Sequence, residues 1–137
     1  MRSLKTHGVE YLLVGGYAVG YHGYPRATSD IDVWVKISTD NSKRIVDALV
    51  DFGFGVESLD PELFLKEERI VRMGNAPLRI EIMMEISGVE FDTCYQQRVE
   101  DNLEGVEVSI IGLDCLKKNK KASGRLKDLS DLEYLSR

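Results

Sequence analysis

Short apolar segments separated by turn residues fill the first third of the chain. Residues 9–14 are apolar except for Glu10 and end at the doublet Gly15-Gly16, which predicts a buried strand followed by a tight turn. Residues 30–35 alternate Asp or Trp with Ile or Val, the two-residue period of a strand with one face in the core. These two segments predict neighbouring strands of a small sheet.

Helical spacing appears next. From residue 40 to Gly53 the chain offers N-cap side chains, then apolar residues spaced along one helical face, then a glycine suited to the position after a helix. Asp60-Pro61 is a second helix start, and it predicts one or two turns that end near residue 65.

The second half of the chain predicts a hairpin, a strand and three helices. Residues 70–73 and 78–86 flank the four-residue segment Gly-Asn-Ala-Pro, which predicts a β-hairpin. Residues 91–99 favour a short helix, and residues 106–110 alternate like a strand. Two closing helices are expected over residues 113–122 and 126–135, the second with a leucine at every third position.

These elements predict an α/β (α+β) fold, in which a small mixed β-sheet has helices packed on one face. With 137 residues, 43% hydrophobic and 30% charged, the chain is expected to form a single domain over residues 1–137 with a core of its own. No apolar run approaches the ~20 residues of a membrane span, and no secretory signal is evident. We expect a cytoplasmic protein that does not bind a membrane, with Cys94 and Cys115 as free thiols.

Charge is unevenly distributed along the chain. The net charge of −5 disfavours a general nucleic-acid coat, yet residues 117–127 hold six basic residues and no acidic one. A local anion site is therefore compatible with the acidic average.

Asp30 and Asp32 are the first candidates for chemistry. Two residues apart on a strand, their side chains project from the same face. Their repulsion would be reversed by a cation between them, and hard oxygen ligands favour Mg²⁺ or Mn²⁺ over zinc. The alternative is a pair of solvated carboxylates on an exposed strand.

Gly15-Gly16 offers backbone N–H groups that a phosphate can approach closely. The doublet fits neither a Walker loop nor a Rossmann fingerprint, and a plain turn is the alternative. On the segment 78–86, Glu81 lies on the polar face and would complete a carboxylate triad if this strand lies beside residues 30–35. The alternative there is a solvated face with an Arg79–Glu81 ion pair.

Together these residues resemble a known family. The sequence V-G-G-Y-A at residues 14–18, followed by P-R-A-T-S-D-I-D-V-W-V at residues 25–35, is similar to the nucleotidyltransferase superfamily with the polymerase-β-like fold. The R-x-T-x-D-I-D element most resembles its small prokaryotic branch of minimal nucleotidyltransferases and abortive-infection toxin-type enzymes. The run R-L-K-D-L-S-D at residues 125–131 resembles the C-terminal element of that branch.

The resemblance implies a nucleoside triphosphate over Gly15 and Gly16, with Asp30 and Asp32 as ligands of Mg²⁺ or Mn²⁺. A third carboxylate would activate the acceptor hydroxyl, and where the family usually has aspartate this chain has Glu81. The catalytic and metal-binding set implied is therefore Asp30, Asp32 and Glu81.

Four basic residues extend the implied nucleotide site: Arg26, Lys118, Lys121 and Arg125. Arg26 is four residues before Asp30, a spacing that favours a phosphate contact, with a surface charge as the alternative. For the three C-terminal cations, the alternative is a solvated helical face.

The sequence thus predicts a metal-dependent nucleotidyltransferase that moves an NMP group from an NTP such as ATP to a hydroxyl acceptor. The acceptor, whether protein, RNA or small molecule, is not specified, and a partner protein chain is expected to supply what a second domain would. The alternative is a non-catalytic nucleotide-binding or antitoxin-like interaction domain of the same fold, a reading that Glu81 favours. A purely structural domain is disfavoured by the glycine doublet and the D-x-D strand occurring together.

Overall fold

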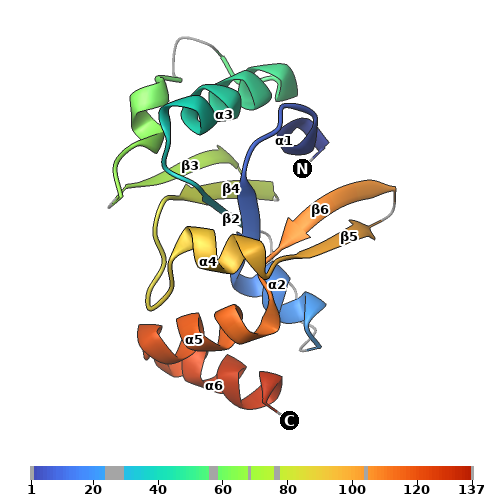
Figure 1. Ribbon diagram of the computed structural model, residues 1–137, viewed down its shortest axis with the longest axis vertical. Helices are drawn as coiled ribbons and strands as arrows, with labels where there is room; N and C mark the ends of the chain where they lie inside the picture. Colours follow the sequence, from blue (N-terminus) through green and yellow to red (C-terminus); the bar gives the residue numbers. More distant parts are fainter. Residues whose placement is uncertain are drawn as a thin grey trace.

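A mixed six-stranded sheet with strand order β3-β4-β2-β1-β6-β5 forms the centre of the fold (Figure 1). The computed structural model describes residues 2–23, 30–55, 59–67, 69–75, 78–103 and 105–136. The strands are β1 (Tyr11–Val14), β2 (Asp30–Val35), β3 (Ile70–Asn75), β4 (Leu78–Met83), β5 (Val99–Leu103) and β6 (Val106–Ile110). The pairs β2–β4 and β1–β6 are parallel and the others antiparallel, which confirms the predicted mixed sheet.

In the part of the chain that the structure describes, six α-helices and a short 3₁₀ helix accompany the sheet. They are α1 (Arg2–Thr6), α2 (Gly15–Tyr21), α3 (Thr39–Phe52), η2 (Pro61–Phe64), α4 (Phe91–Gln96), α5 (Leu113–Ser123) and α6 (Leu126–Leu135). Ser38 caps α3 by accepting a hydrogen bond from the backbone N–H of Asn41, and Gly53 ends the helix at a φ of 121°. Among the helices described, none is long and apolar enough to cross a membrane.

Helices lie on both faces of the sheet, whereas the sequence predicted one (Figure 1). On one face, Ile31, Val33 and Val35 pack against α1 and α3. The other face is polar at Asp30 and Asp32 but ends in Trp34, which is buried and meets the ring of Phe91 in α4 at a centroid distance of 5.2 Å. This face of β2 thus carries the two candidate carboxylates at one end and packs against α4 at the other.

Helix α1 and strand β5 have no counterpart among the predicted elements. Helix α1 has five residues, too few for a helical period, and β5 is an edge strand of sequence V-E-D-N-L that begins at residue 99, where the helix expected over 91–99 was to end; that helix, α4, ends at Gln96. Strand β4 ends at Met83, before the predicted end at residue 86. Each difference arises where tertiary partners, rather than local pattern, decide the conformation.

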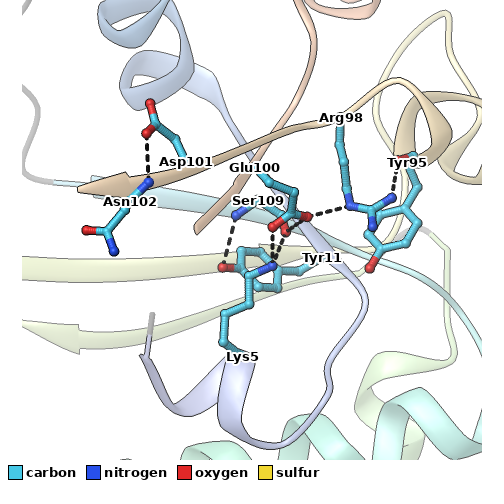
Figure 2. Close-up of polar contacts among 8 residues, drawn as sticks. All are labelled: Lys5, Tyr11, Tyr95, Arg98, Glu100, Asp101, Asn102 and Ser109. Carbon is cyan, nitrogen blue, oxygen red and sulfur yellow. Dashed lines mark hydrogen bonds and ion pairs between the residues drawn. The ribbon is translucent and has the colours of Figure 1, made fainter. Parts of the chain in front are cut away.

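A polar cluster fastens α1 to the β5–β6 hairpin (Figure 2). Lys5 Nζ donates to Glu100 Oε2 and to Ser109 Oγ, each at 2.6 Å, and Arg98 Nε donates to Glu100 Oε1 at 2.5 Å. The buried Tyr11 hydroxyl accepts the Ser109 backbone N–H at 3.2 Å, and burial raises the pKa of Tyr11 to about 12. Burial alone would raise the pKa of Glu100, but hydrogen bonds from Lys5, Ser109 and Arg98 lower it, so the cluster holds a charged carboxylate.

Candidate active site

The three candidate carboxylates come together because β4 lies beside β2. In this parallel pair Asp30 is opposite Arg79 and Asp32 is opposite Glu81. Side chains at matched positions of adjacent strands share a face of the sheet, so Asp32 and Glu81 are neighbours. The sequence hypothesis required this adjacency, and the structure has it.

The surroundings of Asp32 disfavour its charged form. Burial, followed by the charge and hydrogen bond of Glu81 and the charge of Asp30, raises the pKa of Asp32 from 3.8 to about 6, and only Lys120 opposes the rise. Its Oδ1 is buried and has no hydrogen-bond partner among the described residues. A buried carboxylate oxygen with no donor is costly, and a bound cation would remove that cost.

Arginines from two strands hold the other two carboxyls. Arg79 Nε donates to Asp30 Oδ1 at 3.0 Å, and Arg72 Nε donates to Glu81 Oε1 at 2.9 Å. The alternative Arg79–Glu81 ion pair considered from the sequence does not occur in this arrangement, because Arg79 is opposite Asp30 in β2 while Arg72 of β3 is opposite Glu81. The arginines therefore pair with carboxylates of neighbouring strands, and not with one two residues away on the same strand.

Gly15 is required by its approach to Asp32. It has a φ of +66°, and a Cβ at this position would overlap Oδ2 and Cγ of Asp32. The first residue of α2 therefore packs directly on the carboxylate, which only glycine permits. Gly16 is the second residue of α2, and both glycines line the pocket over the carboxylates.

A pocket of about 510 Å³ opens over this face of the sheet. Its wall is formed by the end of β1, the start of α2, β2, β3, β4 and the two C-terminal helices. The ionisable residues that line it are Asp30, Asp32, Arg72, Glu81, Glu85, Lys120, Arg125, Lys127 and Asp128. Carboxylates from the sheet thus share one cavity with cations of the two C-terminal helices, an arrangement suited to a ligand that carries both phosphates and a divalent ion.

Lys120 links this pocket to a buried charge cluster between α5 and α6. It is 6% exposed, and its Nζ lies 2.9 Å from Asp128 Oδ1 and 3.3 Å from Asp131 Oδ2, both aspartates being almost fully buried. Burial opposes ionisation of Asp128, but hydrogen bonds from Ser123, Lys120 and Arg125 lower its pKa to about 2. Asp128 is therefore ionised, and the ion pairs with Asp128 and Asp131 hold the Lys120 side chain beside the pocket.

The predicted C-terminal cations occupy different places. Arg125 lines the pocket, with its Nε 2.7 Å from Asp128 Oδ2. Lys118 lines a separate pocket with the buried free thiols Cys94 and Cys115, and Lys121 is exposed on α5. Of the described residues, neither Lys118 nor Lys121 lines the carboxylate pocket.

Arg26 lies outside the described residues. The sequence prediction of the nucleotide site did not include Lys120, although this lysine belongs to the same basic run. Helical spacing could have identified it, since Lys120 is four residues after Leu116 on the buried face of α5.

The donors fit a magnesium ion held jointly with phosphates. Asp30, Asp32 and Glu81 offer hard oxygen atoms, and one oxygen of Asp32 is unsatisfied. Within the described ranges, no group of three or more His, Cys, Asp or Glu side chains is arranged to hold a metal ion. Mg²⁺ is usually bound by one or two carboxylates together with substrate phosphates and water, so a site completed by a nucleotide suits this donor set.

Comparison with known proteins identifies the fold. A nucleotidyltransferase-like antigenic protein from Paracoccidioides brasiliensis superposes with a TM-score of 0.56 at 15% identity, over 96% of this chain and 69% of that one. A provisionally named nucleotidyltransferase from Thermotoga maritima gives 0.57 at 15% identity, over 96% and 84%. No family model and no curated protein matches the sequence.

The chain therefore has a nucleotidyltransferase-like fold, and the resemblance expected from the sequence is confirmed at that level. The assignment to the minimal and toxin-type branch stays a prediction.

Proposed function

We propose that this protein transfers a nucleotidyl group from a nucleoside triphosphate to a hydroxyl acceptor, with Mg²⁺ or Mn²⁺ as cofactor. The observation that carries the proposal is the state of Asp32. It is a buried carboxyl beside Glu81, and one of its oxygens has no hydrogen-bond partner among the described residues. The helical wall of the same pocket carries three cations, Lys120, Arg125 and Lys127, and one carboxylate, Asp128. A nucleotide with its divalent ion would satisfy both walls at once.

The proposed binding roles divide between the two walls. Gly15 and Gly16 provide a surface without side chains against which phosphates can lie, and Arg125 and Lys120 supply positive charge opposite the carboxylates. Asp30, Asp32 and Glu81 would hold the divalent ion. When bound, Mg²⁺ supplies charge neutralisation for an in-line displacement at the α-phosphorus.

The proposed chemistry balances without a further reactant. The acceptor oxygen forms a bond to the α-phosphorus, the bond from that phosphorus to the β-bridging oxygen breaks, and pyrophosphate leaves. The acceptor proton passes to a carboxylate, for which Glu81 is the candidate because its Oε1 already accepts a hydrogen bond at this position.

A second candidate is a nucleotide-binding or antitoxin-like module without turnover. The contacts of Arg72 with Glu81 and of Arg79 with Asp30 favour it, because the two arginines satisfy these carboxylates without a metal ion. This candidate predicts metal-dependent nucleotide binding and no transfer to any acceptor.

Ligand-induced stabilisation tests the shared part of both candidates. Mg²⁺ with each of the four NTPs should raise the melting temperature of the wild type, because a ligand that binds only the native state stabilises it. Asp30→Asn combined with Asp32→Asn should abolish the rise. Asp47→Asn, at an exposed position on α3, is the matched control and should retain it. A rise of equal size in the double variant would place the nucleotide elsewhere.

A further inference from the structure

The contact between Arg72 and Glu81 differs from a permanent structural ion pair in its place at the pocket and in the exposure of the arginine. It joins directly opposed residues of β3 and β4, with Nε 2.9 Å from Oε1, and it lies at the lining of the carboxylate pocket. The Arg72 side chain is 63% exposed, while that of Glu81 is 22% exposed. The arginine therefore reaches from solvent onto a carboxylate that is largely covered.

This position puts Arg72 in competition with a divalent ion. Glu81 Oε1 cannot both accept from the guanidinium in its present place and coordinate a cation there, and an arginine does not lose its charge at neutral pH. Ion pairs with so exposed a partner are weak, so displacement of Arg72 costs little. Arg72 is therefore exchangeable, unlike Lys120, which is buried between two aspartates.

A displaced guanidinium would have a suitable partner in the same pocket. A nucleoside triphosphate carries several negative charges, and the planar guanidinium forms paired hydrogen bonds to phosphate oxygens. The contact with Glu81 uses only Nε, and the guanidinium carries further N–H donors. The same side chain can thus neutralise Glu81 in one state and a phosphate in the other.

We propose that Arg72 is an exchangeable counter-ion: it covers Glu81 in the metal-free protein and moves to the triphosphate when nucleotide and divalent ion bind together. The protein then binds the metal weakly alone and tightly with nucleotide. This inference rests on the proposed function, since it assumes that the pocket takes a triphosphate with its ion.

The exchange predicts that removing the charge of Arg72 changes two affinities in opposite directions: that for Mn²⁺ alone and that for a nucleotide with Mn²⁺. Arg72→Gln keeps a hydrogen-bonding side chain but removes the charge. In titrations of Mn²⁺ alone, followed by electron paramagnetic resonance of the free ion, this variant should bind about two- to fivefold more tightly, the range for loss of an exposed ion pair. A non-hydrolysable ATP analogue with Mn²⁺ should bind about tenfold more weakly, because one charged hydrogen-bond donor to phosphate is lost.

Two further variants separate charge from position. Arg69→Gln removes the same charge just before β3, at a residue that lines a different pocket, and should change neither affinity. Arg72→Lys retains the charge and should restore part of the analogue affinity. Urea unfolding of each variant verifies that all are folded.

The outcomes distinguish this inference from the proposed function. If the wild type shows Asp32-dependent binding of Mn²⁺ and analogue while Arg72→Gln leaves both affinities unchanged or weakens both, the exchange is wrong and the site stands. If the wild type binds neither Mn²⁺ nor the analogue, the proposed function and the exchange both fail.

Discussion

Replacing Asp32 by Asn should make the ligand-free protein more stable while removing its ability to bind metal and nucleotide. The carboxyl is buried, lies beside Glu81 and Asp30, and has one oxygen without a donor among the described residues. An Asn amide has nearly the same shape, carries no charge, and can donate to Glu81 as the protonated acid would. The substitution therefore relieves a cost that the native protein bears at neutral pH.

The size of the gain follows from the pKa of Asp32, which rises from 3.8 to about 6 on folding. A shift of about two units corresponds to about 3 kcal/mol. Solvent reaches part of this side chain and screens its charge, so we expect a gain of about 1–2 kcal/mol in the free energy of unfolding.

The pH dependence of the gain has a definite sign. Because the folded-state pKa lies above the unfolded-state value, the native protein holds the extra proton between about pH 4 and pH 6, and the wild type loses stability as the pH rises through that window. The advantage of Asn should be complete above about pH 6 and small below about pH 4.

Urea unfolding of wild type and Asp32→Asn at several pH values measures the difference, since titrating groups away from the carboxylate pocket cancel between the two proteins. Asp47→Asn on α3 is the matched control and should show no pH-dependent gain. A wild type as stable as Asp32→Asn near neutral pH, or a gain of the same size at acid and neutral pH, would refute the reasoning.

Three further substitutions probe the site. Gly15→Ala should cost about 2 kcal/mol more in urea unfolding than Gly8→Ala, because both glycines have nearly the same φ, +66° and +68°, but only at Gly15 would a Cβ meet another side chain; equal costs would show that φ alone matters. Lys120→Met should destabilise the protein by about 3–5 kcal/mol, since it removes the buried cation that contacts both Asp128 and Asp131, whereas Lys121→Met at an exposed position should change the midpoint little; similar midpoints for the two would contradict the buried cluster. Glu81→Gln should largely preserve nucleotide binding but lower turnover by ~10²-fold or more in a steady-state assay, and unchanged turnover would assign the acceptor proton to another group.

The parts of the site that the sequence predicted are those set by local pattern. Alternation along residues 30–35 placed Asp30 and Asp32 on one face, and the turn after residues 9–14 placed Gly15 near the end of β1. Both follow from a two-residue period and from glycine at a turn, which need no knowledge of distant contacts. The sequence placed Glu81 beside these residues only if its strand lay next to residues 30–35, and in the structure β4 pairs with β2.

The parts that were missed depend on pairing between distant segments. Arg72 lies opposite Glu81 only because β3 and β4 pair in one register. That register continues to Asn75 opposite Leu78, so β3 extends into the segment 74–77 that the sequence predicted to connect the two strands. Lys120 could not be separated from its five basic neighbours by charge, because only helix phase and the aspartates of α6 bury it. Tertiary partners decide both positions.

The most direct test of the central claim compares the fate of the α-phosphate with that of the γ-phosphate of a nucleoside triphosphate. Purified protein, Mg²⁺ and cell lysate as the source of acceptor should be incubated with each NTP labelled at the α- or at the γ-phosphate. The account predicts that α-label enters an acceptor while γ-label is released in pyrophosphate, and that Asp30→Asn with Asp32→Asn abolishes the transfer. Transfer of γ-label instead, or transfer of α-label at an equal rate by the double variant, would contradict nucleotidyl transfer at these carboxylates.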